Sequence, residues 1–190
     1  MLNPKTVLDR FLRRDAPPAT PPLEPHDRVV AWATTAEAVA VASIRALWLP
    51  PKKGAEGVTG PDGTEWHRLG WSEIHKAVWR DGALVVTTGV EIEPGVVTDG
   101  PERRLRLVEP RDLPAEVRTR VTKSVAYTEH HRLSTGGGVR VVARRVPGRD
   151  GLTWHLRFDD PSDREVPAAR AEAEGLLTEA RVSWGDGPAA

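Results

Sequence analysis

The chain has 190 residues and a mass of 20.8 kDa, and its 27 basic and 27 acidic residues give a formal net charge of zero. The absence of cysteine excludes a disulfide framework, a cysteine nucleophile and metal sites with thiolate ligands. A hydrophobic content of 39% with seven tryptophans indicates a folded core, and zero net charge argues against a histone-like attraction to nucleic acid. No apolar run approaches the ~20 residues of a membrane span and the N-terminus lacks a secretory pattern, so we expect a cytoplasmic protein.

Residues 1–27 are expected to form a short helix followed by a proline-rich linker. Apolar residues recur with helical spacing between residues 4 and 14, with arginines on the other side. Five prolines between residues 16 and 26 favour an extended, semi-rigid segment that wraps over the domain surface. The alternatives are a basic amphipathic membrane anchor for the helix and a proline-recognising partner for the linker.

Short β-strands are predicted to dominate residues 28–109. Alternating apolar residues place strands at 28–34, 38–44, 46–49, 66–70, 75–79, 83–91 and 102–109. Asp81-Gly82 predicts a tight hairpin turn. Residues 50–65 and 92–101 are rich in glycine and proline and predict a long loop and a second loose stretch. Most tryptophans are expected in the core, whereas an exposed one near the 50–65 loop would indicate an interface.

Helical and strand patterns continue in the last third of the chain. A helix is expected after Asp112 as N-cap, with an apolar stripe from Leu113 to Val125 at every fourth residue. A β-hairpin of residues 139–146 and 152–158 follows, and a final helix is expected from residue 162 or 163 to 182. The sequence therefore predicts an α+β protein in three parts: residues 1–27, a β-domain with a capping helix at 28–126, and a hairpin-plus-helix extension at 127–190.

The segment Leu69–Val78, LGWSEIHKAV, resembles the strand junction of bacterial pleckstrin-homology-like (PH-like) domains. In those domains an aromatic residue or proline precedes an acidic-Ile pair, and the next strand starts at once. Seven strands followed by an amphipathic helix is also their element order, and the layout is similar to that of an uncharacterised actinobacterial family. The resemblance covers residues 28–125 and implies a seven-stranded antiparallel barrel or sandwich with a capping helix. The first hairpin turn, Thr34–Glu37, has no basic residue, which argues against phosphoinositide binding.

Potential catalytic residues do not form a recognisable motif. Glu129, His130 and His131 are the densest cluster, and they could join His155 or Asp159 in space. Adjacent strand residues point to opposite faces, so both histidines would rarely bind one ion. Surface histidines near a helix C-terminus are the alternative. No serine lies in a nucleophile motif and the triple glycine precedes a strand, so we expect no enzymatic activity, no cofactor and no metal.

Charge is unevenly distributed along the chain. Residues 101–149 contain 12 basic and 5 acidic residues, whereas residues 150–190 contain 4 basic and 9 acidic ones. Either the two segments neutralise each other, or the basic one binds an anionic partner. Arg140 and Arg144 alternate along one strand and are expected on one face. The candidate binding residues are Arg104, Arg106, Arg118, Arg140, Arg144 and Arg145.

Three functions are compatible with these patterns. We expect a non-enzymatic protein-interaction or scaffolding module that binds a protein partner or itself. The first alternative is anion or nucleic-acid binding through residues 103–149. The second alternative is an enzyme or metal site at residues 129–131.

Overall fold

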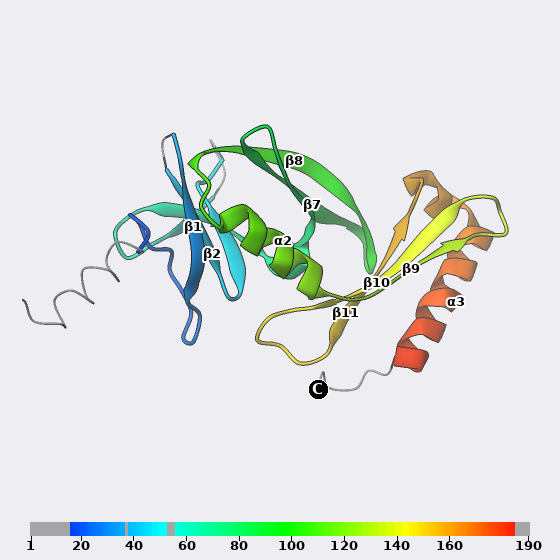
Figure 1. Cartoon of the computed structure of the whole chain (residues 1–190). Helices are drawn as coiled ribbons and strands as arrows, with labels where there is room; N and C mark the ends of the chain where they lie inside the picture. Colours follow the sequence, from blue (N-terminus) through cyan, green and yellow to red (C-terminus); the bar gives the residue numbers. More distant parts are fainter. Residues whose placement is uncertain (1–15, 37, 53–55, 185–190) are drawn as a thin grey trace, which may run out of the picture.

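The structure is a computed structural model that describes residues 16–36, 38–52 and 56–184, so the expected N-terminal helix lies outside the described residues. The described chain is an α+β protein built on one large sheet (Figure 1). Its strands are β1 (Val29–Thr35), β2 (Val39–Ser43), β3 (Ala46–Leu49), β4 (Val58–Thr59), β5 (Glu65–Gly70), β6 (Ile74–Arg80), β7 (Ala83–Glu93), β8 (Val96–Glu109), β9 (Val125–Arg132), β10 (Gly138–Arg145) and β11 (Leu152–Phe158). Its helices are α2 (Leu113–Ser124) and α3 (Pro167–Trp184), with short 3-10 turns η1 (Trp71–Glu73) and η2 (Pro161–Glu165).

The sheet is open rather than closed into a barrel. Its order is β4-β5-β3-β2-β1-β8-β11-β10-β9, and the β6–β7 hairpin branches from β8. The long β8 joins the two halves, because its C-terminal end pairs with β1 and its first residue, Val96, pairs in parallel with Leu156 of β11. The predicted barrel closure is therefore wrong. Among the described strands β6 pairs only with β7, and α2 packs against β6 from the side of the core.

The long hairpin of β7 and β8 corrects the predicted loose stretch at residues 92–101. β7 continues to Glu93 and β8 begins at Val96, so only Pro94 and Gly95 lie in the turn. Gly95 has a φ of 76°, which favours glycine, and its N–H donates to Glu91 Oε1 at 2.7 Å. The glycine and proline at this position therefore mark a tight turn between continuous strands. Likewise, the predicted loop at 50–65 contains the two-residue strand β4, which pairs with β5.

Two details around α2 also differ from expectation. Asp112 precedes the helix, but its side chain makes no capping hydrogen bond. Val125 does not continue the helical stripe, because it is the first residue of β9, a strand that the sequence did not predict. β9 forms since its backbone pairs along the whole length of β10.

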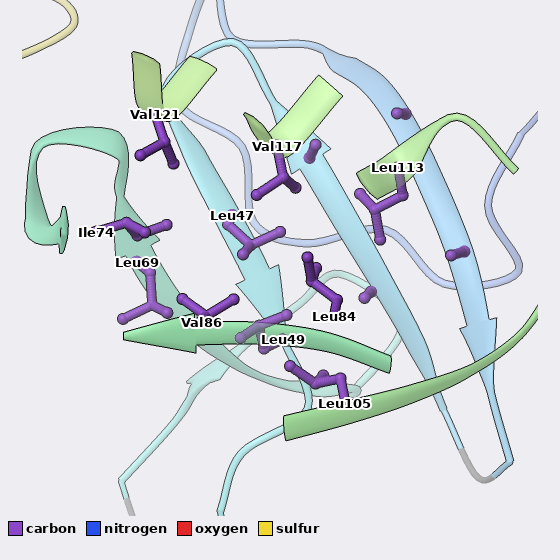
Figure 2. Close-up of a cluster of buried hydrophobic side chains, with 14 of the residues drawn as sticks. Leu47, Leu49, Leu69, Ile74, Leu84, Val86, Leu105, Leu113, Val117 and Val121 are labelled. Carbon is purple, nitrogen blue, oxygen red and sulfur yellow. The ribbon is translucent and has the colours of Figure 1, made fainter. Parts of the chain in front are cut away.

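The main hydrophobic core lies between the β1-β2-β3-β5 layer, the β7-β8 layer and α2. Figure 2 shows Leu113, Val117 and Val121 of α2 pointing toward Leu47 and Leu84 from the strands. Each fully buried side chain of this kind stabilises the fold by about 1.5–3 kcal/mol. The spacing of the α2 residues, every fourth position, explains why this face of the helix is buried.

The opposite face of the β1-β2-β3-β5 layer is buried as well. It presents Trp32, Trp48 and Trp66, which are 8%, 3% and 1% exposed. Ala19 and Leu23 from the proline-rich segment pack against this cluster. The segment is therefore a strap over the sheet, as its composition predicted.

A second core lies between β9-β10-β11 and α3, on the right in Figure 1. Ala169, Ala173 and Ala180 form the buried stripe of α3, and their small side chains let the helix lie close to the sheet. The predicted hairpin is confirmed as β10 and β11. The final helix begins at Pro167, since the residues before it form the separate turn η2.

Candidate functional site

The six predicted binding arginines do not form one patch. Arg104 and Arg106 are exposed on β8, and Arg104 lies 3.9 Å from Asp81. Arg118 is exposed on α2 and Arg145 is exposed at the end of β10, where they border different cavities. Arg140 is exposed on β10. The positive charge of the 103–149 segment is thus spread over several surfaces.

Arg144 was predicted to bind a partner on the same face as Arg140, and the structure corrects this prediction. It is only 6% exposed, and its Nη1 donates to the Ile74 carbonyl at 2.9 Å and to Ser124 Oγ at 3.0 Å. Burial, with a smaller contribution from Arg157, lowers the pKa of its guanidinium. The end of β10 runs beside the first residue of β6 and the last residue of α2, so Arg144 links three elements and is not available to a ligand.

The Glu129-His130-His131 cluster divides between two faces of β9, as alternation in a strand requires. His130 Nε2 lies 2.7 Å from Asp159 Oδ2, whereas His131 Nε2 lies 3.8 Å from Glu129 Oε2. Both histidines lie within a strand rather than at a helix end. Within the described ranges, no group of three or more His, Cys, Asp or Glu side chains could hold a metal ion.

A polar network that the sequence did not predict lies where the two halves of the sheet meet. His75 Nδ1 lies 2.9 Å from Asp99 Oδ1, and Arg157 Nη2 donates to Asp99 Oδ2 at 2.6 Å. A Cβ at Gly89 would lie 2.2 Å from His75 Nε2, so a larger residue there would displace the imidazole from its contact with Asp99. Burial lowers the pKa of His75 and of the nearby His155, whose Nδ1 is buried and has no hydrogen-bond partner among the described residues. Gly89 inside a predicted strand was the one sequence feature that could have indicated this close approach.

A groove runs between the edge strand β6 and α2. Its volume is about 750 Å³, and it is lined by Ala77, Val78, Trp79, Pro110, Arg111, Pro114, Ala115 and Arg118. Trp79 is 41% exposed, in contrast to the four tryptophans buried in the first half of the chain. Arg118 is exposed and makes no ion pair with any described residue, whereas Arg111 stacks on Trp32 at 3.7 Å. The groove lining contains two cations and no acidic side chain.

The free edge of β6 is defined by its hairpin. Asp81 and Gly82 form a two-residue turn with φ values of 51° and 69°, so the flanking Arg80 and Ala83 are a hydrogen-bonded pair of the ladder. In an antiparallel pair, every second residue directs both backbone groups away from its partner strand. The register therefore directs the N–H and C=O groups of Ala77 and Trp79 toward the open edge. These are the groups that an added strand would pair with.

No helix within the described part of the chain is long and apolar enough to cross a membrane. Comparisons of the chain with protein-family models, with curated proteins and with solved structures each found no match.

Proposed function

We propose that this protein is a non-enzymatic, cytoplasmic protein-interaction module that binds an extended segment of a partner along the free edge of β6. The observation that supports the proposal most strongly is the combination of an unpaired strand edge with an adjoining groove and an exposed tryptophan. Strand addition of this kind derives affinity from backbone hydrogen bonds and specificity from pockets for alternate side chains.

A PH-like architecture for residues 28–126 is part of the proposal. Apart from the two-residue β4, seven strands precede α2, in the order that the resemblance implies. α2 packs on the inner side of the strands, as a capping helix would. In a closed barrel, β6 would be paired on both sides and would leave no edge for a partner. The open edge of β6 in this chain therefore supports binding there.

The groove chemistry favours an acidic peptide with an apolar side chain. Trp79 and Ala77 offer apolar surface, and Pro110 and Pro114 lack N–H donors that would need a polar partner. Arg118, which has no acidic neighbour in the groove, would pair with a carboxylate of the peptide. Tryptophan and arginine are the side chains most enriched among residues that dominate binding energy.

The proposal is tested by selecting peptides from a displayed library of random 12-residue sequences on the full chain. We expect enrichment of acidic, extended sequences whose affinity falls at least about tenfold in Ala77→Pro, because proline blocks the free edge without removing a bond to β7. Arg118→Glu should weaken the same peptides, whereas Arg106→Glu on β8 should not. Thermal unfolding of each variant confirms that the fold is intact.

Two results would contradict the proposal. Peptides that bind wild type and Ala77→Pro equally would show that the β6 edge is not used. Dimerisation of the free chain that Ala77→Pro abolishes, measured by analytical ultracentrifugation, would identify a second copy as the occupant instead of a peptide.

A further inference from the structure

A row of three basic or imidazole side chains crosses the β9-β10-β11 sheet on the face away from α3. The ladder register pairs Arg140 with His130 of β9 on one side and with Arg157 of β11 on the other. Neighbouring strands lie about 4.8 Å apart, so the three side chains leave the sheet within about 10 Å of one another. This juxtaposition could not be read from the sequence, since the three residues are separated by 10 and 17 positions.

Arg140 has no anionic partner among the described residues. The neighbouring Arg157 is bonded to Asp99 and His130 is bonded to Asp159, so both flanking side chains already have a carboxylate partner. Directly opposed like charges, as at the Arg140–Arg157 pair, destabilise a sheet unless an anion compensates them. The centre of the row is therefore an unsatisfied cationic position on an otherwise paired surface.

The carboxylates of Asp99 and Asp159 also orient the row. Asp99 accepts from Arg157 Nη2, which leaves Nε and Nη1 of that guanidinium for a ligand. Asp159 contacts His130 Nε2 and so holds the imidazole ring in place on β9. A Cβ at Gly138 would lie 2.2 Å from Asp159 Oδ2 and 2.8 Å from His130 Nε2, so this pair meets over Gly138 of β10, two residues from Arg140.

We infer that the His130–Arg140–Arg157 row is a binding site for a single phosphate group, free or carried as a monoester by a small molecule. A guanidinium fork matches the geometry of phosphate oxygens and can bind them with two hydrogen bonds. Asp99 beside Arg157 and Asp159 over Gly138 limit the site to one anionic group, because a polyanion lying across the row would meet these carboxylates. The site is independent of the β6 groove and uses different strands.

The test is a calorimetric or NMR titration of the full chain with inorganic phosphate and with phenyl phosphate, at constant ionic strength set with sodium chloride. We expect saturable binding with a millimolar dissociation constant that weakens about fivefold or more in Arg140→Gln. Arg106→Gln is the matched control, since it removes one exposed, unpaired strand arginine elsewhere, and it should change binding less than twofold. Tighter binding of phenyl phosphate would identify a monoester, and equal binding would identify free phosphate.

Several outcomes would overturn the inference. Absence of saturable binding to either probe is one, and equal binding by wild type and Arg140→Gln is another. Strong binding of a 20-base-pair DNA duplex that Arg140→Gln leaves unchanged would assign the anion affinity to another surface. Because Arg140 is exposed, its replacement does not threaten the fold, and a thermal melt of the variant checks this.

Discussion

Replacing the buried Arg144 by methionine should destabilise the protein because the buried Ile74 carbonyl loses its hydrogen-bond donor. Methionine keeps most of the side-chain volume, so little cavity forms. Ser124 Oγ still donates to the Val121 carbonyl at 2.7 Å and stays satisfied. The carbonyl of Ile74, a residue that is 0% exposed, loses the donor that Arg144 supplies. An unsatisfied buried acceptor costs about 1–3 kcal/mol, which the removal of a desolvated guanidinium partly offsets.

We therefore expect Arg144→Met to lower the free energy of unfolding by about 1–3 kcal/mol, which corresponds to about 2–4 °C in melting temperature per kcal/mol. Urea unfolding followed by tryptophan fluorescence measures it. The control is Arg145→Met, the next residue, which is exposed and should change stability by less than about 0.5 kcal/mol. Both acceptors of Arg144 are neutral, so screening by salt should change these hydrogen bonds little. The stability difference between the two variants should therefore persist in about 0.5 M salt. Equal stabilities of the two variants would refute the structural role of Arg144.

Three further predictions follow from local geometry. Gly89→Ala should lose about 1–3 kcal/mol of stability by denaturation, since its Cβ would clash with His75, whereas Gly175→Ala, with open space around it in α3, should gain up to about 1 kcal/mol. Burial lowers the pKa of His75 and His155 below 6.5, so the unfolded state binds more protons than the folded state and the free energy of unfolding should fall as pH drops below 6.5. His155→Phe should make this fall of stability with pH less steep. Leu23→Asp should loosen the strap and shift tryptophan emission to longer wavelength.

Local patterns predicted most of the regular structure because strands and helices depend on short-range spacing. Alternation placed β1, β2, β3, β5, β6 and β7, and the Asp81-Gly82 turn fixed one hairpin. β9 was missed, since its polar second half shows no alternation and its pairing is supplied by β10. Residues 92–101 were predicted as a loose stretch because they are rich in glycine and proline. Composition does not reveal that β7 and β8 stay paired up to the turn at Pro94-Gly95.

The sequence by itself determined which residues could carry charge, which could turn the chain and which faces were apolar. It could not distinguish Arg140 from Arg144, because both occupy equivalent positions in the same alternating strand. Only the tertiary structure decided this, by placing Ile74 and Ser124, 70 and 20 residues away, over one of them. The tertiary structure likewise decided that the β6 edge stays open and that Arg140 lies between His130 and Arg157. Local spacing sets the direction of a side chain relative to its own strand, whereas the environment that gives the side chain its role comes from distant segments.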